Sequence, residues 1–428
     1  MASLSPRNAL RGVMLAGMAA VAFGAVHFLR WPKMQPVVAS LTATGEKMPE
    51  FGNASDWDIW LSTRDLEIRS QAERGVEDSV SALILFGTTF TNLPPIASAN
   101  AAANAAGSLT PAVNARIDAF IKALDERDDE RFVTVLDFLR RRRVTEEELR
   151  AFLAGIVRRL ALERTGEERL HEYTTSALLM VDFAIEGALR ALKSKGETPA
   201  QTHRIAIISG GLDFAGTPDN YDFHQPQAIT PFAVLEAALR LNLAQPGDAQ
   251  VVVFELGPFA LAHLRSAAAK ARAGGRYVLQ LPRRSSDGWN AAATAYWGHF
   301  GDLIGATTPA ISVPVELHGV ETRAVAVKPQ LAARIGAEDM DVVTETADNT
   351  AGTGFDLVVA LHALATFDRI EQTLAFASIA QMMNAGGLFL ADAPVSAVIP
   401  AELQPIGVEH VTFTDRGEGH DIAAYRRK

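Results

Sequence analysis

Two apolar runs in the second half of the chain end in residues that could bind a cofactor. Residues 204 to 208 are followed by small residues at 209 to 211, and the run from Val251 to Phe254 ends in Glu255. A glycine backbone can approach a ligand closely, and its N–H groups suit a carboxylate or phosphate. A carboxylate at the end of the next strand is placed to hold ribose hydroxyls. Alternatively, the glycine turn is structural and Glu255 caps a helix that begins at Pro258.

A polar insertion separates these two elements. Residues 216 to 227 contain Tyr221, Asp222 and His224, and Asp213 stands just before them. Above the carboxyl edge of a sheet, such polar and aromatic groups are typical of a substrate-binding or lid element. The other interpretation is an ordered loop whose polar groups satisfy one another.

His362 follows a third apolar run, residues 355 to 361. If this run is a parallel strand, the imidazole lies at the same carboxyl edge. It is then either a general base with a pKa near neutrality or an ordinary polar residue at a strand end.

A second insertion, residues 277 to 329, is rich in aromatic residues. Trp289, Tyr296, Trp297 and His299 lie within it. These side chains either wall a pocket or anchor the insertion onto the helical part of the chain.

The elements around these residues alternate between strands and helices after Gly196. This order predicts an α/β domain with a mostly parallel sheet and helices on both faces. The expected strands are 205–208, 251–254, 342–345, 355–360 and 388–391, the helices are 231–243, 258–273 and 370–383, and residues 408–414 and 421–426 form a closing antiparallel hairpin.

The preceding part of the chain is expected to be helical. Thr145 and Glu148 form a capping-box pattern at one helix start, and Gly196 is placed to end the last helix. Residues 97–114, rich in Ala and Asn, are expected to be a loop. The expected helices are 56–90, 115–126, 129–142, 146–164 and 167–195. The predicted division is a signal or anchor at 1–30, a linker at 31–55, a helical domain at 56–198 and an α/β domain at 199–428.

The first residues carry the pattern of an export segment. Arg7 and Arg11 precede the apolar stretch from Gly12 to Leu29, and Ala22-Phe23-Gly24 has the small-x-small pattern of a cleavage site. The stretch is either a cleaved signal peptide or a membrane anchor, and the remaining alternative is an ordinary helix. We expect the protein to lie in the cell envelope, exported or anchored in the inner membrane.

Composition excludes several classes of function. The formal net charge of −10 repels nucleic acid, which needs a concentrated basic surface. The chain has no cysteine, so disulfides, thiolate metal sites and a cysteine nucleophile are excluded. The expected substrate is a small molecule or an envelope component.

The last 225 residues or so resemble the class I S-adenosylmethionine-dependent methyltransferases. The resemblance rests on the strand at 355–360, the helix at 370–383, the Asn384-Ala-Gly-Gly-Leu turn into the next strand, and the closing hairpin. The glycine loop is degenerate, because the family usually has an acidic residue before three glycines. The resemblance implies a Rossmann-like sheet with S-adenosylmethionine as cofactor. It implies that Ser209, Gly210 and Gly211 face the methionine part of the cofactor, Glu255 the ribose, Asp348 and Asn349 the adenine, and His362 the transferred methyl. Asp213 follows the same loop and is a further candidate for the cofactor, and Tyr221, Asp222 and His224 of the polar insertion are candidates for the reaction.

Two main hypotheses follow. The chain is a methyltransferase with an unknown acceptor, or it is a catalytically inactive binding or scaffolding protein of the envelope with the same fold. Export favours the second, because S-adenosylmethionine is a cytoplasmic metabolite. An NAD-dependent oxidoreductase is disfavoured by the closing hairpin.

Overall fold

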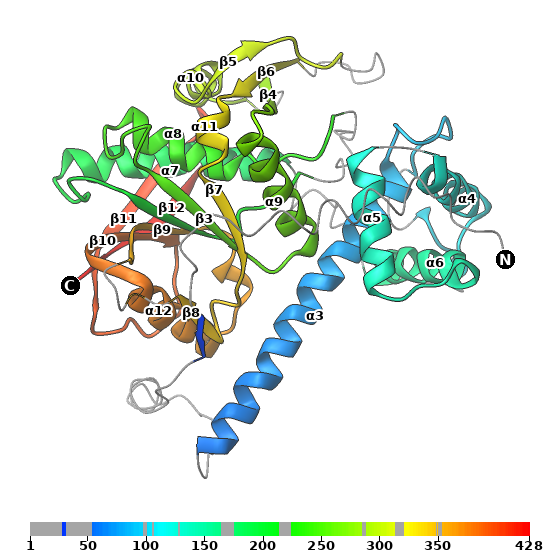
Figure 1. The fold of residues 1–428 in the computed structure, drawn as a ribbon, viewed down its shortest axis with the longest axis horizontal. Coiled ribbons are helices and arrows are strands. Elements are labelled where there is room, and N and C mark those ends of the chain that lie inside the picture. The colour runs from blue at the N-terminus through cyan, green and yellow to red at the C-terminus, as the bar shows by residue number, and fades with distance from the viewer. Residues whose placement is uncertain are drawn as a thin grey trace.

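A computed structural model describes residues 28–30, 54–96, 101–104, 107–126, 129–163, 175–213, 224–284, 288–312, 321–347, 349 and 353–428. Figure 1 shows a twisted sheet with helices on both faces, a group of helices beside it, and the long helix α3 running from that group across to the sheet. The expected fold class, a Rossmann-like α/β sheet with a closing antiparallel hairpin behind a helical region, is confirmed.

The main sheet has seven strands in the order β11-β12-β10-β9-β2-β3-β7. The neighbours from β10 to β7 are parallel, whereas β12 is antiparallel to both β10 and β11. The last strand is therefore inserted between two earlier ones, as the closing hairpin predicts. The strands are β2 (Arg204–Ile208), β3 (Gln250–Glu255), β7 (Ile335–Asp339), β9 (Phe355–Ala360), β10 (Met383–Asp392), β11 (Leu403–Thr412) and β12 (Gly419–Arg427).

Apolar side chains on alternate positions of the central strands enter two separate cores. In β2, Ile205 and Ile207 pack into one core, which we call the α7 face, with α7 (Thr175–Ser194) and α8 (Thr230–Arg240). Ala206 and Ile208 enter the opposite core, the α12 face, with α12 (Arg369–Met382). Burial on both faces explains why the central strands are continuous apolar runs in the sequence.

One expected strand is wrong. Residues 342–345 were expected in the main sheet, but residues 342–344 form a turn, and the strand beside β3 is β7. Val342 and Val343 belong to this turn and are buried in the α12-face core. They are apolar because they are buried, and not because they form a strand. β7 has the sequence IGAED, with a single β-branched residue, and carries little strand signal.

The helical part surrounds a third core. Its helices pack through Phe120, Phe132 and Leu153, and the Thr145–Glu148 capping box is present, with the Glu148 N–H 3.3 Å from the Thr145 hydroxyl. The loop expected over 97–114 is too long, since α4 begins at residue 111, where proline is favourable at a first helical position. The helices are α3 (Ala54–Phe86), α4 (Pro111–Glu126), α5 (Glu130–Arg141) and α6 (Glu146–Glu163).

The helix α7 packs on the sheet and not among the N-terminal helices. Ile185, Leu189 and Leu192 are fully buried in the α7-face core. Gly196 follows with φ 72°, a left-handed conformation that ends the helix. The domain boundary at residue 198 stays a prediction.

The aromatic insertion forms a second, three-stranded antiparallel sheet in the order β4-β6-β5. Trp297 is fully buried in the α7-face core, and Tyr296 packs edge-on against Phe183 of α7 at 5.5 Å between ring centroids. These aromatic residues therefore anchor the insertion. Its elements are β4 (Tyr277–Arg284), α10 (Ala291–His299), β5 (Gly305–Thr308) and β6 (Glu321–Val327), and α9 (Pro258–Arg272) and α11 (Pro329–Ala332) flank them.

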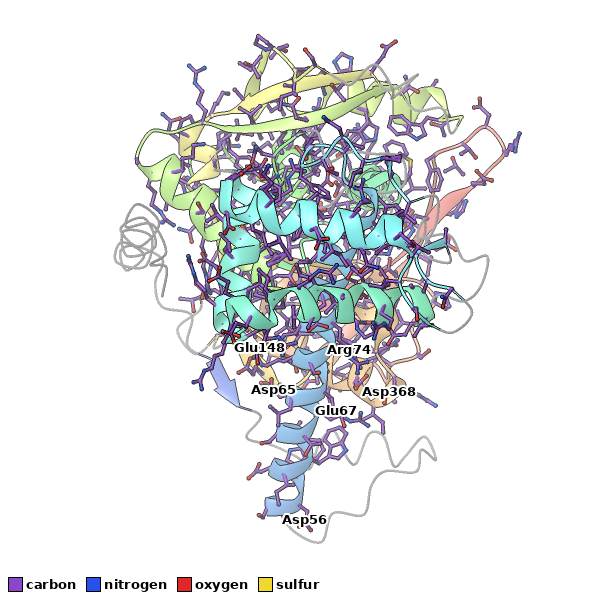
Figure 2. All side chains as sticks on the ribbon, turned by 90° about the vertical axis from the view of Figure 1, so that its right-hand side faces the viewer. Asp56, Asp65, Glu67, Arg74, Glu148 and Asp368 are labelled. Atoms are coloured by element: carbon purple, nitrogen blue, oxygen red, sulfur yellow. The ribbon has the colours of Figure 1, made fainter. Side chains whose placement is uncertain are left out.

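The helix α3 belongs to both parts of the molecule. Its first half packs Trp57, Leu61 and Ile68 into the α12-face core, and its second half packs Val80 and Leu83 among the helices. Figure 2 shows Asp56, Asp65 and Glu67 along the part of α3 that extends beyond the helical group. This helix therefore links the N-terminal helices to the sheet.

Most of the predicted export segment lies outside the described residues. Its last residues enter β1 (Phe28–Arg30), which pairs antiparallel with β8 (Glu345–Ala347). None of the described helices has the length and apolar character needed to cross a membrane.

Candidate ligand-binding site

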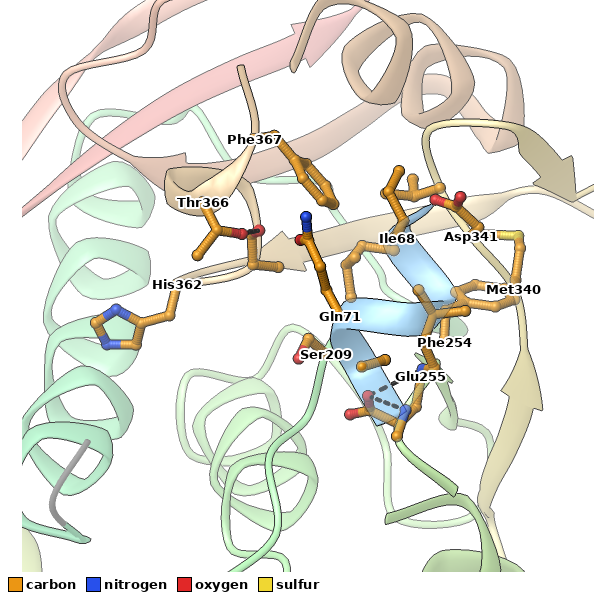
Figure 3. Close-up of a pocket in the computed structure, with 16 residues that line it drawn as sticks. Ile68, Gln71, Ser209, Phe254, Glu255, Met340, Asp341, His362, Thr366 and Phe367 are labelled. Atoms are coloured by element: carbon orange, nitrogen blue, oxygen red, sulfur yellow. Dashed lines mark hydrogen bonds between the residues drawn. The ribbon is translucent and has the colours of Figure 1, made fainter. Parts of the chain in front are cut away.

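A cavity of about 310 Å³ lies at the carboxyl ends of β2, β3, β7 and β9. Ligand pockets range from about 300 to 1,000 Å³, so this one has room for a compact ligand. The parallel strands contribute Ser209, Glu255, Asp341 and His362, and α3 closes the opposite side (Figure 3). The structure thus brings together three residues predicted from sequence: Ser209, Glu255 and His362.

Ser209 and His362 have left-handed backbones, with φ of 59° and 64°. Such conformations are uncommon for residues other than glycine and cluster at functional sites. Ser209 directly follows β2, and His362 follows the end of β9 by two residues. Two strand ends are therefore bent at the cavity.

Glu255 ends β3 and lines the cavity. One carboxylate oxygen, Oε1, accepts hydrogen bonds from the N–H groups of Leu256 and Gly257, each at 2.9 Å. Burial raises the pKa of Glu255, and the N–H groups of Gly257, Leu256 and Gly211 oppose that rise. The carboxylate holds the two residues that lead into α9 and also lines the cavity, and its role toward a ribose stays a prediction.

Asp341 is a second acid in the cavity wall and was not predicted from sequence. It is fully buried and follows β7 by two residues. Its oxygens accept from the Val343 N–H at 2.9 Å and the Thr344 hydroxyl at 3.0 Å. Burial raises the pKa of Asp341 to about 6, although these hydrogen bonds oppose the rise.

The two predicted glycines shape the loop and do not form the cavity wall. A Cβ on Gly210 would lie 2.8 Å from Val253 Cγ1, so glycine is needed there for packing between strands. Gly211 has φ 68°, and its N–H supports Glu255. Neither glycine is among the residues that line the cavity, and their approach to a cofactor stays a prediction.

His362 lies at the rim, and Figure 3 shows its ring directed away from Gln71 and Glu255. Its backbone N–H donates to Asp392, whose other oxygen is 2.6 Å from His420 Nε2. The two imidazoles meet edge to face, 5.5 Å apart between centroids. Desolvation lowers the pKa of His362, as does His420, whereas Asp392 raises it. Sequence reasoning missed this pair, although Asp392 directly follows the predicted strand 388–391.

Asp213 and His224 form a separate cluster and do not line the cavity. The backbone of Asp213 pairs with Gln227, and its carboxylate lies 3.5 Å from His224 Nε2. The His224 carbonyl accepts from Arg131 of α5 at 2.7 Å. These buried groups contact one another and α5, and their role in ligand or substrate binding stays a prediction. Tyr221 and Asp222 lie outside the described residues.

Asn349 is also placed elsewhere. Its Nδ2 donates to the Met383 carbonyl at 2.8 Å, at the start of β10 and thus at the opposite edge of the sheet. The error follows from the misplaced strand at 342–345: the strand beside β3 ends at Asp339, so Asp341 occupies the expected place. Asp348 lies outside the described residues.

A metal centre finds no support in the described parts of the chain. Among those residues, no group of three or more His, Asp or Glu side chains is arranged to hold an ion. The acids in the cavity instead face hydrophobic groups such as Ile208, Phe254 and Met340.

Comparison with known proteins gives fold-level neighbours. No family model matches the sequence, and no curated protein matches it. Similar solved structures include the N-methyltransferase NodS from Bradyrhizobium japonicum WM9, with 13% identity, a TM-score of 0.28, and coverage of 57% of this chain and 94% of that one. Magnesium protoporphyrin IX methyltransferase from Synechocystis PCC 6803 with bound SAM has 9% identity, a TM-score of 0.30, and coverage of 61% and 87%.

A TehB-like SAM-dependent methyltransferase from Corynebacterium glutamicum has 10% identity, a TM-score of 0.22, and coverage of 58% and 98%. All three neighbours are methyltransferases by name. Their identities and TM-scores are low, so an activity for this chain must be argued from its own residues.

Proposed function

We propose that this chain binds S-adenosylmethionine in the cavity at the carboxyl edge and is a methyltransferase. The observation that carries the proposal is the meeting of Ser209, Glu255, Asp341 and His362 in one cavity, at the ends of four parallel strands. Ligands of open α/β sheets bind outside the carboxyl ends of the strands, where the connections diverge. The inserted antiparallel strand β12 supports a methyltransferase over a dinucleotide-binding oxidoreductase.

The residues present fit the adenosyl part of this cofactor. Glu255 would accept hydrogen bonds from the ribose hydroxyls through the oxygen that is not engaged by Leu256 and Gly257. Asp341 would accept from an amino group on the base, and Phe254 and Met340 would enclose the base with apolar surface. The bound cofactor would supply a methyl group on a positively charged sulfur.

The rest of the chemistry falls to the protein. Catalysis of methyl transfer rests largely on alignment of the nucleophile with the methyl group, which binding of both in this cavity would provide. His362 at the rim, with its lowered pKa, is neutral near pH 7 and can accept a proton from an acceptor that must lose one. Asp392 would hold the backbone of His362 and the ring of His420 in place.

Calorimetry on the full-length chain tests the proposal. We expect binding of S-adenosylmethionine and S-adenosylhomocysteine, and none of NAD. Glu255→Gln keeps an acceptor for its own loop but loses the charge, and a charged hydrogen bond contributes about 1.5 to 3 kcal/mol, so affinity should fall about tenfold to a hundredfold.

The matched control is Glu338→Gln, a carboxylate of β7 that does not line the cavity. No heat at millimolar S-adenosylhomocysteine would contradict the proposal. Equal binding by wild type and Glu255→Gln would remove Glu255 from the site.

We also propose that residues 1–30 direct the chain to the cell envelope and that the acceptor is a small molecule or an envelope component. The support is the basic and apolar pattern of Arg7, Arg11 and Gly12 to Leu29. S-adenosylmethionine is made in the cytoplasm and would then have to reach the exported site. Binding of this cofactor by the full-length chain is therefore the first measurement to make.

A further inference from the structure

The helix α3 forms a wall of the cavity although it lies outside the sheet. Ile68, Gln71 and Ala72 line the cavity from this helix. Ile68 is only 5% exposed and is packed into the α12-face core, whereas Ala72 is half-buried and Gln71 is exposed, so the wall runs from the folded interior to the open side of the cavity. A ligand in the cavity would therefore touch the N-terminal helices as well as the strand ends.

Arg69 fixes this wall to the sheet. Its guanidinium contacts Asp339 at 2.5 Å, at the end of β7, and Glu345 at 3.2 Å, at the start of β8. Asp65, one turn earlier on α3, lies 2.9 Å from Arg69 Nε and aligns the side chain. Because Asp339 and Glu345 flank Asp341 in sequence, Arg69 holds α3 directly over the acidic side of the cavity.

Gln71 extends from α3 into the cavity, toward Thr366 and Phe367 (Figure 3). Within the described parts of the chain, its amide makes no hydrogen bond. The carboxylates of Glu255 and Asp341 can only accept when ionised, whereas the Gln71 amide offers two donors and an acceptor. It adds donor capacity to a cavity whose wall also holds these two acids.

We infer that Gln71 is a ligand-binding residue and that Arg69 is its positioning residue, so the ligand site is shared between α3 and the sheet. The ligand presents an acceptor atom to the Gln71 amide, such as a ring nitrogen of a purine or a carboxylate oxygen. The inference rests on the proposed function, which places an adenosyl ligand in this cavity. Arg69 acts without touching the ligand, by keeping α3 in register with β7.

The test uses calorimetry of the full-length chain with S-adenosylhomocysteine. Gln71→Ala and Gln71→Glu should each weaken binding about threefold to tenfold, the effect of one lost neutral hydrogen bond. Gln71→Glu should weaken it more, because it adds a negative charge to a cavity that already holds two acids. Ser70→Ala is the control: it is exposed on the same helix and does not line the cavity, and it should bind as wild type does.

Arg69→Gln should also weaken binding, and it has a second readout. Limited chymotrypsin digestion should cut within residues 54–72 faster in Arg69→Gln than in wild type, and S-adenosylhomocysteine should slow the cut in both. If wild type binds and both Gln71 variants bind equally well, the inference is wrong while the proposed function stands. If wild type binds nothing, the proposed function and this inference fail together.

Discussion

Ser209 and His362 show how single residues are held at the cavity. A left-handed backbone costs a residue other than glycine about 1 to 3 kcal/mol and persists only where the surroundings fix it. The Phe254 carbonyl accepts the Ser209 N–H at 2.8 Å, and Asp392 accepts the His362 N–H. Each strained residue is thus fixed by the neighbouring strand, which keeps both at the cavity.

Asp182 is a buried acid that does not line the cavity. It lies in α7, is 1% exposed, and neither carboxylate oxygen makes a well-formed hydrogen bond within the described residues. Burial raises the pKa of Asp182 to about 8, and only the nearby Thr230 hydroxyl opposes the rise. The folded protein therefore binds a proton at pH 7 that the unfolded chain, with a carboxyl pKa of about 3.9, releases.

We expect Asp182→Asn to stabilise the protein at neutral pH. The raised pKa means that the free energy of unfolding falls as pH rises from about 4 to about 8 and then levels off. Asn has no charge to bury, so its advantage should grow from pH 5 to pH 8 and reach about 1 to 4 kcal/mol. Urea unfolding across this range measures it. Asp248→Asn, at an exposed position, should show no such trend, and a pH-independent effect of Asp182→Asn would contradict the argument.

Sequence reasoning found Glu255 at the end of one strong strand, but it missed Asp341 beyond a weak strand and Asp392 at the end of a strong one. Glu255 ends a run of three valines and a phenylalanine, so its place at the sheet edge was predictable. Asp341 follows β7, whose sequence has a weak strand signal. The apolar pair Val342-Val343 beyond it gave a false strand signal. Gln71 could not be predicted, because its place in the cavity wall depends on how α3 packs against the sheet, and local sequence does not encode that packing.

At the scale of elements, α7 shows that local sequence predicts a buried face but not the partner of that face. The stripe of Ile185 and Leu189 predicted one buried face, and that face packs on the sheet. The partner could not be read from the stripe, since an apolar helix face fits a helix or a sheet equally. The contact is close: a Cβ on Gly187 would lie 2.7 Å from Val411 Cγ1 of β11.

Two helix glycines therefore predict opposite effects of the same substitution. Gly187→Ala in α7 should destabilise the protein by about 1 to 3 kcal/mol, because the added methyl overpacks the contact with β11. Gly155→Ala in α6 has no atom within 4 Å of the added Cβ, so it should stabilise by about 0.4 to 1 kcal/mol. Thermal unfolding of both variants tests this, and a Gly187→Ala protein as stable as wild type would show that α7 can shift away from β11.

At the scale of the whole molecule, three cores are joined through few elements. The two sheet cores share the strands, and α3 connects the α12-face core to the core of the N-terminal helices. α5 adds a second connection, since Glu130 Oε1 lies 2.6 Å from His263 Nδ1 and His263 Nε2 lies 2.7 Å from the Tyr277 hydroxyl. The helical part is therefore docked at two places, and one of them is the cavity.

The strand β1 bears on how the predicted export segment would work. An anchor running from Gly12 to Leu29 needs its last residues in the bilayer, where about 20 apolar residues are required to span. Phe28 and Leu29 instead pair with β8, which shortens the stretch left for an anchor. Cleavage after Gly24 would leave β1 on the mature chain, so we favour a cleaved signal over an anchor.

A fusion of residues 1–40 to alkaline phosphatase should therefore give an active, exported enzyme, because this phosphatase matures only outside the cytoplasm. In the full-length chain, N-terminal sequencing of the exported protein should begin at Ala25, directly after Ala22-Phe23-Gly24. Gly24→Leu, which removes the second small residue of that pattern, should leave the precursor uncut while Arg7 and Arg11 still target it to the membrane. An inactive fusion retained in the cytosol would refute export, and an intact N-terminus on a membrane-bound chain would show that the segment is an anchor and that β1 pairs with β8 beside the bilayer.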